Sequence, residues 1–113
     1  MKENNQPICQ VDQFGTKFWL LNGQYHREDG PAVEWADGSK FWYFSNLLHK
    51  LDGPAAEYAD GDKHWFLHGK LHRLDGPAYE GKDGYKEWYY YGEHIKCFSQ
   101  KEFKRLIKLK ALW

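Results

Sequence analysis

Three stretches of the chain nearly repeat one another: HREDGPAVE at 26–34, HKLDGPAAE at 49–57 and HRLDGPAYE at 72–80. They recur every 23 residues without an insertion, and 12 of the 23 positions are identical between 38–60 and 61–83. The same spacing aligns four tryptophans, which are Trp19, Trp42, Trp65 and Trp88. Self-similarity at a fixed period indicates an array in which each unit stacks on its neighbours.

Each unit reads as two short strands joined by tight turns. The first strand is an aromatic run at 17–21, 40–44 and 63–67, and such runs suit a pleated, half-buried surface. It ends at Asn22-Gly23 or the matching dipeptide, where Gly and Asn tolerate a left-handed backbone. A loop at 26–31, a second strand near 32–36 and an Asp-Gly turn follow. The predicted fold is all-β, an antiparallel solenoid-like meander of about eight strands.

The two ends of the array differ from its units. The fourth unit has no DGPA, and Ile95 stands where the pattern has His. Ser99 and Glu102 form a capping-box pattern ahead of apolar residues at helical spacing. We expect one domain, with a polar, irregular N-terminal segment at 1–14, repeats at 15–37, 38–60, 61–83 and 84–98, and a C-terminal capping element at 99–113 that is helical over about 99–111.

Composition excludes several classes of protein. The 113 residues carry 16 basic and 16 acidic side chains, so bulk attraction to nucleic acid or to an anionic membrane is not expected. Six Trp, eight Tyr and seven Phe argue against disorder. The sequence has no long apolar run and no secretory signal, and Cys9 and Cys97 form neither a metal-binding pair nor a disulfide framework. We expect a cytoplasmic, non-enzymatic protein with free thiols, no cofactor and no metal.

The unit W-x-x-x-G-x-x-H-[RK]-x-D-G-P-A resembles MORN-type repeats, in the variant found in small bacteriophage and bacterial repeat proteins, over residues 15–92. It places D-G-P-A where the plain MORN pattern has a glycine-rich HGxG. MORN-like arrays generally act as scaffolds, and lipid binding has been proposed for some. The resemblance to the phage type implies a role in blocking a host protein.

Three His–Asp pairs are candidate sites: His26 with Asp29, His49 with Asp52, and His72 with Asp75. Imidazole and carboxylate can ligate a metal or act as acid and base. The alternative is a structural turn, in which Asp accepts backbone N–H groups and His bonds to the neighbouring unit. Because catalysis needs one site whereas stacking needs the same contact in every unit, the repetition favours the structural interpretation.

Strand alternation separates the aromatic residues into two faces. We assign the tryptophan ladder to the core, since large aromatics dominate burial. The opposite face then presents a partly exposed stripe, and such stripes often mark partner surfaces. The C-terminal helix or a second copy of the chain could equally cover it. The candidate partner-binding residues on this face are Phe18, Phe41, Tyr43, His64 and Phe66.

Charge is concentrated in the C-terminal segment. Residues 96–113 carry six basic side chains and one acidic side chain, a net +5, whereas residues 1–95 carry ten basic and fifteen acidic, a net −5. The basic helix could bind an acidic partner or nucleic acid, or it could simply present a solvated lysine-rich face. Lys104, Arg105 and Lys108 are the candidate partner-binding residues here.

The predicted function is protein binding, with a host protein as partner, for example a bacterial defence component inhibited by occlusion. One alternative is a small-molecule-binding protein, for example one that sequesters a nucleotide, although the sequence has no glycine-rich loop that would bind an anion. A metal enzyme or hydrolase that uses the His–Asp loops is a second alternative. A homo-oligomer formed by edge-to-edge pairing of the open first unit is a third. No membrane partner is expected.

Overall fold

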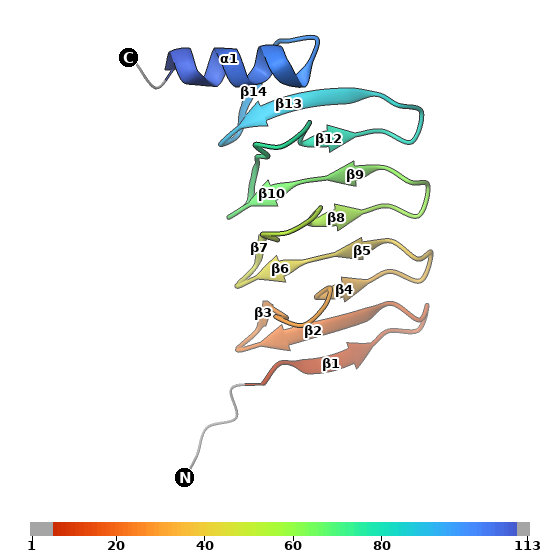
Figure 1. Ribbon diagram of the computed structural model, residues 1–113. Helices are drawn as coiled ribbons and strands as arrows, with labels where there is room; N and C mark the ends of the chain where they lie inside the picture. The colour runs from red at the N-terminus through yellow and green to blue at the C-terminus, as the bar shows by residue number, and fades with distance from the viewer. Residues whose placement is uncertain (1–5, 111–113) are drawn as a thin grey trace.

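The computed structural model describes residues 6–110, which form fourteen short strands and one helix (Figure 1). In chain order the strands are β1 (Ile8–Val11), β2 (Lys17–Leu21), β3 (Gln24–Tyr25), β4 (Val33–Glu34), β5 (Lys40–Phe41), β6 (Tyr43–Phe44), β7 (Leu47–Leu48), β8 (Ala56–Glu57), β9 (Lys63–His64), β10 (Phe66–Leu67), β11 (Lys70–Leu71), β12 (Tyr79–Glu80), β13 (Lys86–Tyr90) and β14 (Glu93–Ile95). The helix α1 (Gln100–Lys110) follows them.

The strands build one large antiparallel sheet that runs from β1 to β14, with α1 beyond the last strand (Figure 1). Its order is β1-β2-β4-β5-β8-β9-β12-β13-β14, and β3 pairs with β2; β6 with β7 and β10 with β11 form two further pairs. The molecule measures 52 × 36 × 17 Å. The shortest of these dimensions, 17 Å, shows that the molecule is thin across its one large sheet. The chain is thus mostly antiparallel sheet with a single C-terminal helix, as expected.

Cross-strand register divides the side chains between two faces, because directly paired residues point to the same side. We call one side the aromatic face; its paired positions across the strands are Phe18, Val33, Phe41, Ala56, His64, Tyr79 and Glu87. We call the other side the loop face, because the DGPA loops lie over it. Its paired positions alternate in charge, in the order Lys17, Glu34, Lys40, Glu57, Lys63, Glu80 and Lys86.

Each unit contains a third short strand that the sequence pattern did not reveal. β3, β7, β11 and β14 pair back onto the preceding strand through two-residue turns. Both turn residues have positive φ, for example 52° at Asn22 and 79° at Gly23, which is the type I′ hairpin geometry. The prediction of two strands per unit, and of about eight in all, is therefore wrong, because two-residue strands are too short to show alternation.

The buried core is thin, and four of the eight buried hydrophobic residues in the described part of the chain are alanines. Ala32, Ala55 and Ala78 are completely buried, and each accepts the backbone N–H of the tryptophan of its own unit at 2.7–2.8 Å. Of the tryptophan ladder, Trp88 is 7% exposed, whereas the other three are half-buried. The prediction that the ladder forms the core is correct only for Trp88, because a single-layer sheet has no second sheet to cover the others.

The N-terminal segment is more ordered than predicted. Residues 8–11 form β1, which pairs with β2 over the register Ile8↔Leu20 to Val11↔Lys17. The sequence of β1, ICQV, is too short to read as a strand from alternation alone, and it gains its order by extending the edge of the sheet. Residues 1–5 of the predicted segment lie outside the described residues.

α1 caps the last tryptophan of the array. The Ser99 hydroxyl accepts the backbone N–H of Glu102 at 3.1 Å, as the capping pattern predicts. Phe103 is completely buried and packs with Trp88 and Ile95. The Trp88 indole N–H also donates to the Gln100 side-chain oxygen at 2.8 Å. The described helix ends at Lys110, so residues 111–113 of the predicted segment lie outside the described residues.

Candidate binding surfaces

The aromatic face carries one connected series of ring contacts. Starting at Phe18, each ring lies 4.4–6.5 Å, centroid to centroid, from at least one other. Offset and edge-to-face pairs at these separations are favourable. The ten rings, which we call the ring series, are Phe18, Tyr25, Trp35, Phe41, Tyr43, Tyr58, His64, Phe66, Tyr79 and Tyr85.

The ring series stays open to solvent at several points. Trp35 is 43% exposed, Tyr58 38% and Tyr85 56%. The DGPA loops and α1 both pack over the tryptophans of the opposite side. These contacts of the loops and of α1 with the tryptophans thus lie on the side opposite the aromatic face.

The carboxylates of Asp60, Asp62 and Glu87 act on the aromatic face, and the Glu87 carboxylate also lies 3.7 Å from the Nε2 atom of His94. Burial raises the pKa of Tyr79, and the nearby carboxylates of Asp62, Glu87 and Asp60 raise it further. Burial lowers the pKa of His64, while Asp62 and Asp60 act in the opposite direction. Glu87 accepts hydrogen bonds from the hydroxyls of Tyr85 and Tyr89, and the bond from Tyr85 holds the Glu87 pKa below its usual value. The face thus combines aromatic rings with a negative field.

The structure brings together the five aromatic-face residues predicted from the sequence. Phe18, Phe41, Tyr43, His64 and Phe66 all belong to the ring series and all are half-buried. The remaining members were missed, among them Trp35 and Tyr58. Each stands two residues after an aromatic-face residue of β4 or β8, so period-two alternation applied to the second strand could have found them.

On the loop face, each of the first three tryptophans lies beneath a cation. The guanidinium carbons of Arg27 and Arg73 lie 3.8 Å from the ring centroids of Trp19 and Trp65, and the Lys50 ammonium lies 3.9 Å from that of Trp42. Such contacts contribute roughly 0.5–1 kcal/mol each at exposed sites. In each of these units, the Arg or Lys that stands two residues before the DGPA motif therefore covers the tryptophan of the same unit.

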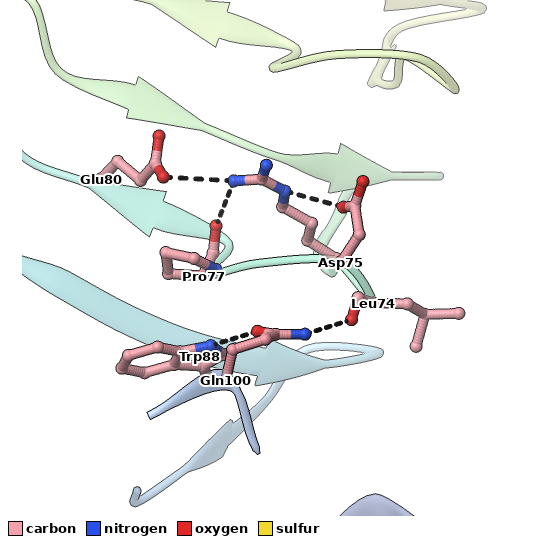
Figure 2. Close-up of polar contacts among 7 residues, drawn as sticks. Leu74, Asp75, Pro77, Glu80, Trp88 and Gln100 are labelled. Carbon is pink, nitrogen blue, oxygen red and sulfur yellow. Dashed lines mark hydrogen bonds and ion pairs between the residues drawn. The ribbon is translucent and has the colours of Figure 1, made fainter. Parts of the chain in front are cut away.

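The guanidinium of Arg73 also links the ends of its own loop (Figure 2). It donates to Asp75 at 2.9 Å, to the Pro77 carbonyl at 3.1 Å and to Glu80 at 3.3 Å. Arg27 makes the matching bonds in the first unit. Figure 2 also shows the Gln100 amide, which joins Trp88 to the Leu74 carbonyl and so ties α1 to this loop.

The three repeat histidines connect neighbouring units. The Nδ1 atoms of His26, His49 and His72 accept the backbone N–H of Ser45, His68 and Tyr91 at 2.8–3.0 Å. Each acceptor lies in one unit and each donor is the first turn residue of the next, which is the structural role that the turn interpretation describes.

The repeat aspartates do not join these histidines. Asp29 and Asp75 bond to the arginines of their own loops, a partner that the turn interpretation did not include. The arginine was missed because the sequence pattern shows only that this position is basic. Among the described residues, no three His, Cys, Asp or Glu side chains gather as a metal site.

The basic helix residues lie on a different surface from the ring series. Lys104, Arg105 and Lys108 line one shallow groove of about 540 Å³ along α1. Lys104 lies close enough to the loop carboxylate of Asp75 to lower its pKa, although the hydrogen bond from Arg73 is the larger cause. The structure therefore does not unite the two predicted groups of partner-binding residues in one site.

Comparison with known proteins finds no matching family model, no matching curated protein and no matching solved structure. In the described part of the chain, no helix has the length and apolar character that crossing a membrane requires. Function must therefore be inferred from the surfaces themselves.

Proposed function

We propose that this chain is a non-enzymatic protein-binding module and that the aromatic face is its binding surface. The observation that carries the proposal is the ring series, ten connected rings on one side of the sheet, of which Trp35, Tyr58 and Tyr85 are 38–56% exposed. Contiguous apolar surface of this kind marks interaction sites in soluble proteins. Tyr, Trp and Phe are also the residues enriched in the centres of protein interfaces.

The rigidity of the sheet supports this assignment. Most rings of the series are half-buried against their neighbours, so their rotamers are already restricted before a partner arrives. Binding loses less free energy when the contacting side chains are ordered in advance. Tyr and Trp add large contact area at low entropic cost, because each has only two side-chain dihedrals.

The finer form of the proposal rests on the sequence resemblance. A MORN-like array of phage type, located in the bacterial cytoplasm, would bind a host protein and inhibit it by occlusion. A sheet in a molecule 52 Å long suits occlusion, because such a sheet can cover a partner's surface without entering a cleft. Stable protein–protein interfaces of standard size bury about 800 Å² on each partner.

Affinity capture with matched variants tests the proposal. The tagged chain is incubated with bacterial lysate, and bound proteins are identified by mass spectrometry and their stoichiometry measured. We expect one stoichiometric partner with the unmodified chain and its loss in the Trp35→Ala/Tyr58→Ala variant. The milder variant Tyr85→Ala, at a residue 56% exposed, should weaken capture if the double variant proves unstable.

The control variant is Leu51→Ala/Leu74→Ala, which removes two loop-face side chains that are 82% and 50% exposed. It should retain the partner. Capture that survives the aromatic-face variants, or that is lost equally in the loop-face control, would contradict the proposal.

A small-molecule site is the second candidate, favoured by a groove of about 680 Å³ between the first two DGPA loops. Trp42, His49, Arg27 and Lys50 line it, together with Asp29 and Asp52. Mass spectrometry of the denatured, freshly purified chain would detect a nucleotide held there. Protein free of any bound small molecule would count against this candidate.

A further inference from the structure

The two faces of the sheet differ in whether a cation lies over their aromatic rings. On the loop face, Arg27, Lys50 and Arg73 each lie within 3.9 Å of a tryptophan centroid. On the aromatic face, none of the ten rings of the ring series has a cation over it among residues 6–110. The molecule thus places a cation over tryptophan rings on one side of the sheet, whereas the rings on the other side contact one another.

The charge around these rings makes the contrast stronger. The paired positions of the aromatic face contain no Lys or Arg, since the lysines of β2, β5, β9 and β13 all point to the loop face. The groups that act electrostatically on His64, Tyr79 and Tyr89 include Asp60, Asp62 and Glu87. A positive group approaching this face therefore meets ring quadrupoles and carboxylates together, whereas a phosphate would be repelled.

We propose that the aromatic face binds a cationic, extended segment of its protein partner, with Arg or Lys side chains stacked on the exposed rings. This proposal rests on the proposed function and names the chemistry of the partner at the same surface. The internal Arg73–Trp65 contact at 3.8 Å is the geometry we expect each partner cation to adopt. The carboxylates of Asp60, Asp62 and Glu87 would balance the incoming charge.

The spacing of the units adds a sequence requirement on the partner. Matching rings of adjacent units, such as Phe41 and His64, are two strands apart in the sheet order. Neighbouring strands lie about 4.8 Å apart, so matching rings are roughly 9–10 Å apart. A polyproline-II segment covers that distance in about three residues, and its turn of three residues brings every third side chain to the same side. A partner segment that runs across the strands would therefore place a cation at every third residue.

Synthetic peptides test this directly. A fluorescein-labelled peptide with four arginines at every third position in a Gly-Ser background is titrated with the full chain, and the dissociation constant is read from fluorescence anisotropy. We expect it to bind at least tenfold more tightly than the same peptide with glutamates, and several-fold more tightly than one whose four arginines are consecutive. Raising the salt concentration should weaken binding.

Two charge-neutralising variants locate the bound peptide. Asp60→Asn/Asp62→Asn removes two charges from the aromatic face while keeping the oxygens that accept the backbone N–H groups of Asp62 and Lys82. Glu28→Gln/Asp52→Asn makes the same change in net charge on the loop face, where both residues are exposed. The first variant should weaken peptide binding at least fivefold, and the second should leave it within twofold.

The possible failures are distinguishable. If no arginine peptide binds, or if both charge variants weaken binding equally, the cationic proposal is wrong, even when the aromatic-face variants still lose the lysate partner. If those variants keep the lysate partner, the proposed function itself fails. Tight binding of a labelled single-stranded DNA that the aromatic-face variants abolish would also overturn the cationic proposal, because it would show that the face accepts anions.

Discussion

At the scale of single residues, the structure gives each letter of the DGPA motif a separate task. In the third unit, Asp75 accepts the Arg73 guanidinium, and the Pro77 carbonyl accepts a second N–H of the same group. A Cβ atom at Gly76 would lie 2.6 Å from the Arg73 guanidinium carbon, so any other residue there would displace the guanidinium from this position. Ala78 is completely buried in the thin core. The motif thus forms an internal binding site for the cationic side chain of its own unit.

The middle unit has the same DGPA motif, but its cation is Lys50 and not an arginine. Lys50 contacts Trp42, yet a compact ammonium cannot reproduce the forked hydrogen bonds that the two arginines make. The acceptors are present, because Asp52, Pro54 and Glu57 stand at the same offsets from residue 50 as the acceptors of Arg73 stand from residue 73. We expect Lys50→Arg to raise the free energy of unfolding by about 1 kcal/mol, since charge-assisted hydrogen bonds contribute on that order.

Urea denaturation followed by tryptophan fluorescence measures the change. The reciprocal variant Arg73→Lys should lower the free energy of unfolding by a similar amount. A decrease with Lys50→Arg would mean that the second loop cannot adopt the geometry of the other two.

The structural role of a residue could be predicted from the sequence where the repeat itself indicated the contact. The histidines repeat with the period of the array, so an inter-unit contact could be expected of them, and they make one. The partner of the aspartates could not be predicted, because a position that reads as Arg or Lys does not reveal that its side chain folds back over a tryptophan. That contact depends on the loop lying on the tryptophan side, which only the three-dimensional structure shows.

At the scale of elements, predictability followed length. The five-residue strand β2 and the eleven-residue helix α1 stand close to their predicted bounds. In the middle units the predicted five-residue strand is interrupted at the tryptophan, as between β5 and β6. The helix was predictable because its capping serine and apolar spacing span several turns. Two-residue strands carry no period and are specified by the turn that precedes them.

α1 allows a matched pair of substitutions at the element scale. Phe103 is completely buried against Trp88, whereas Phe98, five residues earlier, is 87% exposed. Phe103→Ala should therefore lower the free energy of unfolding by about 3–5 kcal/mol, which is typical of a buried phenylalanine. Phe98→Ala should change it by less than about 0.5 kcal/mol.

Both values come from urea denaturation, and Phe103→Ala should also shift the emission of Trp88 toward that of a solvent-exposed indole. Equal effects of the two substitutions would show that α1 does not close the array in solution.

At the scale of the whole molecule, the faces of the sheet could be separated from the sequence, but which one is buried could not. Alternation assigned Trp19 and Phe18 to opposite sides correctly. In a single layer, however, neither side packs on a second sheet, so both residues are half-buried. The two faces differ because the DGPA loops place their cations over the tryptophans on only one side of the sheet. The aromatic face is left as surface, which is why it is the candidate site.

The two ends of the array are also unlike. α1 covers one end, whereas β1 forms the other edge and all four of its residues are exposed. Ile8 and Val11 are each 61% exposed, and β1 contains no charged residue or proline that would discourage pairing. Because a two-fold contact between two β1 edges uses the same edge of both copies, such pairing would stop at a dimer.

The hydrogen-bond pattern specifies how two copies would pair. Asp12 donates its backbone N–H to the Thr16 carbonyl at 3.0 Å, so alternation along β1 turns the backbone groups of Cys9 and Val11 outward. Pairing Cys9 of one copy with Val11 of the other forms four backbone bonds and centres the two-fold axis on Gln10. The two Gln10 residues then face each other with Cα atoms about 4.5 Å apart, which is within disulfide range.

We therefore expect Gln10→Cys, in a Cys9→Ser background, to form a disulfide-linked dimer on mild oxidation at high protein concentration, detected by non-reducing electrophoresis. Gln13→Cys in the same background is the control, because that exposed position lies roughly 10 Å along the chain from the axis and should stay monomeric. Equal crosslinking at both positions would indicate random collision. Its absence at position 10, together with a monomeric mass by ultracentrifugation, would show that the edge of β1 does not pair with a second copy.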